Sequence, residues 1–153
     1  MSTIYSIVYQ PEDKKYESQR GDSFIRESLT EANLIANHGL EGDAKAGRQP
    51  SRQLNILSLE WLNGLKDVGY KTEPGDFGEQ IIIEDLDLDT LQSGDQLHIG
   101  PEAVVEITKP RHGCIRLEAA QGRSNDEYGG LVGKMSKVVT TGVIHVGDQV
   151  IVT

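Results

Sequence analysis

Hydrophobic and polar positions alternate along several short segments of the chain, as they do in half-buried β-strands. Thr3 to Tyr9 is β-rich and alternates, and Gly78 to Glu84 contains three consecutive isoleucines, which predict a buried strand. Five more strands are predicted, at Gln53–Leu57, Gln96–Ile99, Ala103–Thr108, Lys137–Thr141 and Gln149–Thr153.

Helical periodicity is confined to two short stretches. Ser58 can cap a helix whose apolar face is formed by Leu59, Leu62 and Leu65. Ile115 to Gln121 is a second candidate, ended by Gly122. Ser28 to Asn37 is ambiguous between strand and helix. Many short strands with glycine turns and a few short helices predict a mainly β fold, either a barrel or a sandwich.

Three segments show neither strand alternation nor helical periodicity and are predicted to be loops. Gln10 to Asp22 is polar and charged, and Pro74 to Glu79 is a compressed turn before the isoleucine strand. Gly39 to Arg52 carries three glycines and a proline, which indicates a long irregular loop. Loops of this length in compact domains are often functional.

Length and composition restrict the class of protein. A chain of 153 residues with 37% hydrophobic and 25% charged residues fits one soluble domain covering residues 1–153. Its net charge of −9 argues against nonspecific binding to nucleic acid. We expect a cytoplasmic protein without a membrane span, because no apolar run is long enough, no signal-peptide pattern is visible and one cysteine allows no internal disulfide.

That cysteine, Cys114, lies in a basic stretch of an otherwise acidic chain. Lys109, Arg111, His112 and Arg116 surround it, and positive charge favours the thiolate, the form that attacks sulfur or binds metal. One interpretation is a reactive or metal-binding thiol, for which Cys114 and His112 are the candidate catalytic residues. The other is an inert packed thiol beside solvated charges.

A second group of cations lies in the long glycine-rich loop. Lys45, Arg48 and Arg52 could offer ammonium and guanidinium groups to a phosphate, or could simply be solvated surface charges. Other sites are not indicated. The acidic run from Glu84 to Asp89 lacks the glycine and glutamate of a calcium loop, and the four histidines show no zinc spacing.

Taken in order, several segments resemble the MOSC domain, a family named for the C-terminal domain of molybdenum cofactor sulfurase. The Gly-Asp-Phe-Gly-Glu segment and the single downstream cysteine are the most specific of them. The resemblance runs from about Ile4 to Val152 and rests on these segments: Gly39–Asp43, Arg52–Ser58, Pro74–Glu79, Gly94–Asp95, Lys109–Cys114 and Gly147–Asp148.

The resemblance implies a MOSC-like β-barrel with a few short helices and a role in handling sulfur or the molybdenum cofactor (molybdopterin). It implies that Cys114 carries sulfur as a persulfide or ligates molybdenum. Contacts to the phosphate and pterin would fall on Lys45, Arg48, Arg52 and Arg111. Arg111 stands near the position where some relatives have a second cysteine. Pyridoxal phosphate is not expected, because the large domain that uses it in the fused sulfurases is missing.

The leading hypothesis is therefore a molybdenum-cofactor-binding protein that transfers sulfur through Cys114 or coordinates molybdenum with it. A cysteine desulfurase or a molybdoenzyme would be its partner. Two alternatives stay open: a carrier module that binds cofactor without turnover, and a redox-sensing thiol protein. The sequence does not decide whether the chain is an enzyme.

Overall fold

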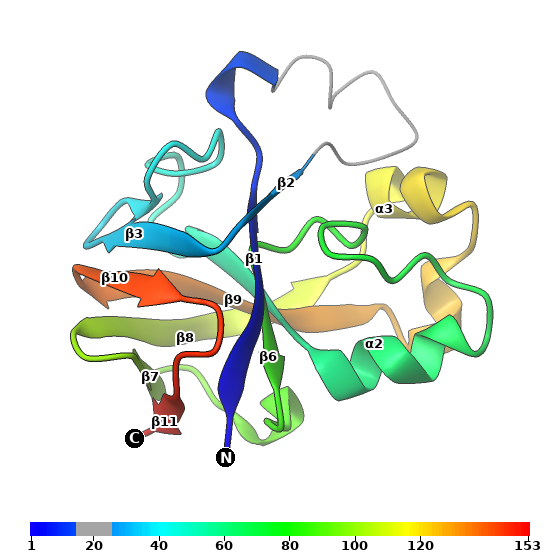
Figure 1. Ribbon diagram of the computed structural model, residues 1–153. Coiled ribbons are helices and arrows are strands. Elements are labelled where there is room, and N and C mark those ends of the chain that lie inside the picture. Colours follow the sequence, from blue (N-terminus) through cyan, green and yellow to red (C-terminus); the bar gives the residue numbers. More distant parts are fainter. Residues whose placement is uncertain (15–25) are drawn as a thin grey trace.

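The computed structural model describes residues 1–14 and 26–153, so most of the predicted loop at Gln10–Asp22 lies outside the described residues. Figure 1 shows a mainly β molecule with its helices gathered at one side. The strands are β1 (Thr3–Tyr9), β2 (Glu27–Leu29), β3 (Glu31–Ile35), β4 (Gly39–Leu40), β5 (Leu54–Ser58), β6 (Ile81–Glu84), β7 (Gln96–Ile99), β8 (Ala103–His112), β9 (Leu131–Thr140), β10 (Gly142–His145) and β11 (Val150–Val152).

The helices among the described residues are short. Two are α-helices, α2 (Leu59–Lys66) and α3 (Ile115–Gln121), and three are 3-10 turns, η1 (Glu12–Lys14), η2 (Leu88–Thr90) and η3 (Asn125–Tyr128). Both predicted helices are thereby confirmed, and the ambiguous segment at Ser28–Asn37 forms strands. No helix in the described part of the chain is long and apolar enough to cross a bilayer.

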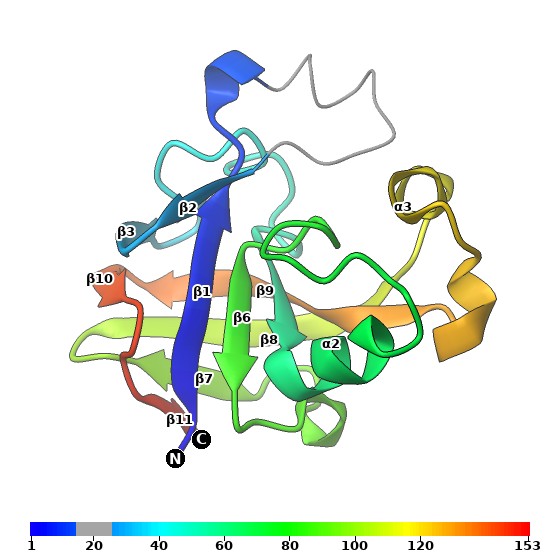
Figure 2. The same cartoon turned by 45° about the vertical axis from the view of Figure 1, so that its right-hand side comes forward.

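Most strands join one sheet of eight, in the order β11-β7-β8-β9-β5-β6-β1-β2, and β10, β3 and β4 form a second sheet. Within the large sheet only β5 and β6 run parallel, and α2 connects them. The long pair β8 and β9 crosses the molecule and extends to the side that carries α2 and α3 (Figure 2). This extension positions the segment that contains Cys114.

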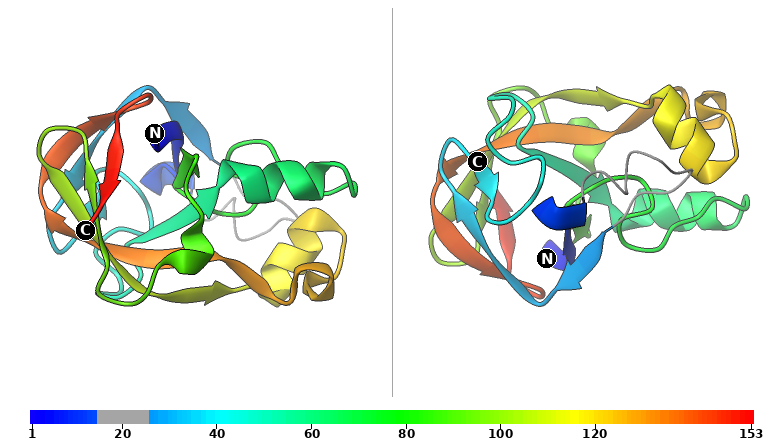
Figure 3. Two further views of the ribbon diagram at one scale, coloured as in Figure 1. Left: turned by 90° about the horizontal axis from the view of Figure 1, so that it is seen from below. Right: turned by 90° about the horizontal axis from the view of Figure 1, so that it is seen from above.

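The strand pairing shows that the prediction of a closed barrel is wrong. Figure 3 shows strands that curve around a common interior, but neither sheet closes on itself. The large sheet ends at β2 on one side and β11 on the other. The β11 end contacts β1, the strand next to β2, through one bridge between Thr3 and Gln149 and a few backbone hydrogen bonds such as Ile4 N to Asp148 O at 2.9 Å. Because β11 has three residues, it is too short to complete the ladder.

Two apolar clusters form the core. The larger fills the curve of the sheets, and its members include Ile4, Ile56 and Val105. The smaller lies between the sheet and the two α-helices, where Leu57 and Ile82 from the strands meet Leu62 of α2 and Leu117 of α3. Adjacent positions on β5 therefore face different clusters, as the alternation of a strand requires.

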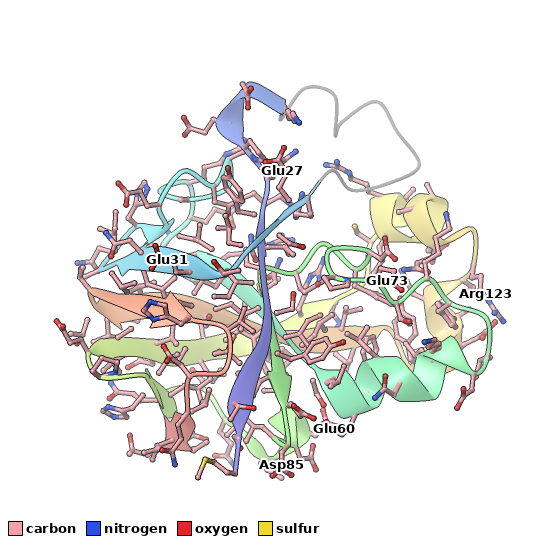
Figure 4. All side chains as sticks on the ribbon, viewed as in Figure 1. Glu27, Glu31, Glu60, Glu73, Asp85 and Arg123 are labelled. Carbon is pink, nitrogen blue, oxygen red and sulfur yellow. The ribbon has the colours of Figure 1, made fainter. Side chains whose placement is uncertain are left out.

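Local sequence explains most boundaries. Ser58 caps α2, accepting a hydrogen bond from Trp61 N at 3.4 Å, as its position before the leucine pattern predicts. Glu60 on α2 accepts from Asp85 N at 2.8 Å, which ties the helix to the end of β6, and Figure 4 shows these two residues side by side. β8 runs four residues beyond the predicted Thr108, because Pro110 is accommodated where the register with β9 shifts.

Candidate functional site

Cys114 lies at the junction between β8 and α3. It occupies the N-cap position of the helix, and its side chain is exposed and makes no capping hydrogen bond. Its backbone carbonyl accepts from Glu118 N at 3.0 Å and from Asn125 Nδ2 at 3.3 Å. The backbone is thus fixed while the thiol is presented to solvent, unlike the packed thiol of the second interpretation.

The loop around Cys114 is packed against η3. Gly113 donates to Gly130 O at 2.7 Å, and a Cβ atom at Gly113 would lie only 2.6 Å from Cγ of Asn125. Tyr128 in turn donates to Asn125 Oδ1. Asn125 therefore clamps the loop from the side, and glycine is required at 113 for that close approach.

Arg111 is the nearest basic residue that the fold buries. It is 3% exposed, and its Nη1 donates to Phe77 O at 2.7 Å. Its Nε has no hydrogen-bond partner among the described residues. The pKa of Arg111 is lowered to about 10, chiefly by burial and also by Arg52, while Glu79 and Cys114 act in the opposite direction. This guanidinium therefore interacts with the thiol and with both neighbouring loops.

The loop before β6 is wrapped around a buried carboxylate. Gly75 and Gly78 have φ angles of 93° and 73°, so both need the conformation that glycine adopts freely. Glu79 is 1% exposed and accepts from Gly75 N at 2.6 Å and Phe77 N at 3.2 Å. Burial raises the pKa of Glu79 to about 7, against the opposing effects of the Gly75 hydrogen bond and of Arg111 and Arg26. Phe77 is fully buried and anchors the turn.

Five cations from separate parts of the chain converge near this loop. The pKa of Lys45 is lowered to about 7, chiefly by burial and also by the positive charges of four arginines. These are Arg26 before β2, Arg52 before β5, Arg111 on β8 and Arg116 on α3. Lys45 and Arg52 are partly buried, so neither is a fully solvated surface charge, whereas Arg48 is exposed.

A cavity of about 360 Å³ opens beside these cations. Its walls come from the loop after β4 and from β5, and one residue precedes β6. The lining residues are Lys45, Arg48, Gln49, Arg52, Gln53, Leu54, Asn55 and Gln80. Three of the residues predicted to contact an anion therefore share one cavity.

A buried polar network supports the cavity floor. Asp43, 1% exposed, accepts from Gln10 N at 3.0 Å and from Gln80 Nε2 at 3.1 Å. Gln80 Oε1 accepts from Asn55 N at 2.7 Å. The network joins the loop after β4 to β5 and β6, and it holds the cavity wall in one arrangement.

The structure places the remaining predicted residues differently. Arg116 on α3 is partly buried, and its pKa is lowered by burial, an effect that Cys114 opposes. His112 is exposed while Arg111 is buried, which turns the histidine away from the inward-facing guanidinium. A catalytic role for His112 stays a prediction.

Sequence reasoning missed two acidic residues and two others at this site. Arg26 stands far from the basic stretches and has no local pattern around it, and Asp43, Glu79 and Asn55 were not distinguished from ordinary turn or strand residues. Glu79 carried the one usable signal, since a carboxylate two residues before a run of buried isoleucines is rarely free of a partner.

Comparison with known proteins supports this architecture. The family model described as MOSC domain matches residues 43–151, which include both the cavity and Cys114. The chain belongs to the MOSC domain family. This family is linked to binding of the molybdenum cofactor. Comparison with functionally curated proteins finds no significant sequence match.

Solved structures of MOSC proteins share the fold at low sequence identity. YiiM from Geobacillus stearothermophilus superimposes with a TM-score of 0.75 at 20% identity, covering 100% of this chain and 75% of that one. YuaD from Bacillus subtilis gives 0.73 at 19% identity, covering 99% and 96%. YiiM from Escherichia coli gives 0.66 at 21% identity, covering 99% and 69%. Identities at this level establish a shared fold, so the chemistry has to be argued from the residues of the site.

Proposed function

We propose that this MOSC protein binds the molybdenum cofactor as a phosphorylated pterin and carries sulfur on Cys114. The observation that carries the proposal is the convergence of Arg26, Lys45, Arg52, Arg111 and Arg116, in a chain of net charge −9, beside an exposed thiol. Within residues 1–14 and 26–153, the buried carboxylates near these cations are Asp43 and Glu79. A cluster of cations with Arg111 buried and the other four partly buried attracts an anionic ligand.

The residues present suit the parts of that ligand. Lys45, Arg48 and Arg52 line the cavity and would hold the phosphate through charge-assisted hydrogen bonds. Cys114 would contact the end of the ligand that bears sulfur and molybdenum, because thiolates suit both sulfur transfer and binding of this metal. When bound, the cofactor would supply a redox-active metal held by sulfur.

The sulfur step requires only a persulfide donor. The Cys114 thiolate attacks the outer sulfur of a donor persulfide, the donor's S–S bond breaks, and the donor leaves as a thiolate while Cys114 becomes a persulfide. No net oxidation occurs. Arg111 and Arg116 would stabilise the attacking anion, since the charge of Cys114 already acts on both. A cysteine desulfurase as donor and a molybdoenzyme as acceptor are the partners that this chemistry proposes.

Mass spectrometry tests the sulfur step. Protein incubated with a small-molecule persulfide should gain about 32 Da, the mass of one sulfur atom, on the peptide containing Cys114. Cys114→Ser is the control and should gain nothing. Return of the mass to its starting value on adding an acceptor thiol supports a carrier of sulfur, whereas a gain of oxygen without sulfur transfer would favour the redox-sensing alternative.

Content analysis tests the cofactor. Protein purified from cells that make molybdopterin should contain molybdenum by elemental analysis and a fluorescent pterin after oxidation. The Arg52→Ala variant should contain less of both. Bound pterin without any sulfur adduct on Cys114 would favour the carrier module, and absence of pterin from protein shown to be folded would contradict the proposed ligand.

A further inference from the structure

The backbone that carries the exposed thiol is held through the side chain of Asn125 in η3. Asn125 is 9% exposed, and its Nδ2 donates to Cys114 O at 3.3 Å. The preceding residue, Gly113, donates to Gly130 O at 2.7 Å and lies so close that a Cβ atom there would be 2.6 Å from Asn125 Cγ. Displacing Asn125 would therefore release the segment that presents the thiol.

Tyr128 fixes the orientation of the Asn125 amide. Its hydroxyl donates to Asn125 Oδ1, which leaves Nδ2 to face Cys114 O. The Tyr128 ring is held in turn, because it packs edge to face on Trp61 and Phe77 with centroid distances of 5.5 and 6.2 Å. Burial is the main reason why the pKa of Tyr128 is raised to about 12, so the hydroxyl keeps its proton and donates at neutral pH.

The thiol held in this way lies within the field of two guanidinium groups. The charge of Cys114 acts on Arg111 of β8 and on Arg116 of α3. Arg111 is 3% exposed and donates to Phe77 O, so it cannot follow the thiol if the loop moves. Because the attraction between charges falls with their separation, the position of the Cys114 backbone decides how strongly these cations act on a molecule that reacts at the sulfur.

We propose that Asn125, oriented by Tyr128, is a positioning residue that holds Cys114 beside the cations, so that Cys114 reacts with anionic sulfur compounds in preference to neutral ones. The substrate class is a persulfide donor with negative charge close to its reactive sulfur. This inference rests on the proposed function for the exchange itself, in which the Cys114 thiolate attacks the outer sulfur and the donor leaves as a thiolate. It adds two residues that act through the backbone of Cys114 and do not touch the reacting atoms.

Alkylation with two reagents of nearly equal size tests the inference. Iodoacetate is anionic and iodoacetamide is neutral, each alkylates a thiolate and releases iodide, and Cys114 is the only cysteine in the chain. The ratio of the two rates is compared with the same ratio for N-acetylcysteinamide, a free and uncharged thiol. The wild type should favour iodoacetate about fivefold more than the free thiol does, the scale of one unit charge acting through water at about 4 Å. Raising the salt concentration from about 0.05 to about 0.5 M should reduce this preference.

Three variants separate positioning from structural support. Tyr128→Phe removes the hydroxyl and keeps the ring, and Asn125→Leu removes both amide contacts at similar size. Each should lower the preference for iodoacetate at least about twofold, because the loop is freed from the fixed charge of Arg111. Tyr70→Phe is the matched control, since it removes another hydroxyl of the same aromatic cluster, one that donates to Ser124 O at 3.0 Å. It should leave the preference unchanged.

The outcomes distinguish this inference from the proposed function. An unchanged preference in folded Tyr128→Phe, or an equal loss in Tyr128→Phe and Tyr70→Phe, overturns the positioning role. Tyr128→Phe decides the question even if Asn125→Leu does not fold, because its ring packing is retained. A wild-type rate ratio equal to that of the free thiol overturns the selectivity for anions. Selective alkylation of a wild-type protein that gains no sulfur from a persulfide instead contradicts the proposed function and leaves the positioning role standing.

Discussion

At the scale of single residues, Arg52 should contribute to binding rather than to folding. It lines the cavity and contributes to the group of charges that lowers the pKa of Lys45, and its backbone N–H makes a local hydrogen bond to Gln49 O. Arg52→Ala should weaken phosphate binding by about 1.5–3 kcal/mol, the loss of one charge-assisted contact. Titration calorimetry with phosphate would measure it.

Lys66→Ala is the matched control for Arg52→Ala, because Lys66 is an exposed cation on the last turn of α2 and lies outside the cavity. It should change neither affinity nor stability. If Arg52→Ala unfolds the protein in denaturant while phosphate affinity persists, Arg52 is structural and the assignment of the anion site to this cavity is wrong.

Two residues with displaced pKa values predict how stability varies with pH. The pKa of Glu79 is raised from 4.5 to about 7, so between these values the folded state holds a proton that the unfolded state has lost, and stability falls as pH rises. The pKa of Lys45 is lowered from 10.5 to about 7, so above 7 the unfolded state holds the extra proton and stability rises. The combined contribution of Glu79 and Lys45 to the free energy of unfolding is therefore lowest near pH 7.

Denaturant unfolding across this pH range would check the prediction. Glu79→Gln should remove the fall on the acid side, and Lys45→Met should remove the rise on the alkaline side, each judged against the wild-type profile. A Lys45→Met profile that parallels the wild type above pH 7 would contradict the prediction. Phosphate should also bind more tightly below pH 7, where Lys45 is protonated.

At the scale of elements, the turn before β6 is defined by its glycines. Gly78 has a φ of 73° and donates to Gly75 O at 2.9 Å, while Phe77 between them is fully buried. A β-branched side chain in that conformation is strained, so Gly78→Val should lower the free energy of unfolding by at least about 1 kcal/mol. Chemical denaturation would measure the change.

Gly64→Val provides the comparison for Gly78→Val. Gly64 lies within α2, and a Cβ atom there would meet nothing within 4 Å, so valine should be close to neutral or slightly stabilising. An unchanged midpoint for Gly78→Val, combined with lost phosphate binding, would show that the turn belongs to the ligand site rather than to the scaffold.

The elements also show what local sequence can and cannot predict. Ser58, the isoleucine run and Gly122 mark their elements correctly, because caps, β-branched residues and left-handed glycines act locally. Gly142–His145 was not predicted to be a strand, since β10 is defined by its pairing with β3 more than 100 residues earlier. The site behaves likewise: Cys114 and Arg111 stand out in sequence, whereas Arg26 and Asn55 join them only through long-range pairing.

At the scale of the whole molecule, the C-terminal strand β11 contacts the start of β1 without closing the curved sheet. β11 pairs with β7, and Val150 N donates to Ser2 O at 2.9 Å next to the bridge between Thr3 and Gln149. The chain termini consequently lie close together in Figure 1. Val150 is 5% exposed within the larger apolar cluster, so its side chain holds this contact from the inside.

Val150→Ala should therefore act across the sheet. We expect it to destabilise the fold by about 2 kcal/mol through lost burial and a residual cavity, while Ile151→Ala, at a half-exposed neighbour, costs much less. Hydrogen exchange should accelerate at the Ile4 amide, which donates to Asp148 O, although β1 is at the opposite end of the sequence. Phosphate binding should persist in the folded variant, because the cavity is built from β5, Gln80 and the loop after β4. Faster exchange confined to β11 and β7 would instead mean that the two edges are energetically independent and that the sheet behaves as open.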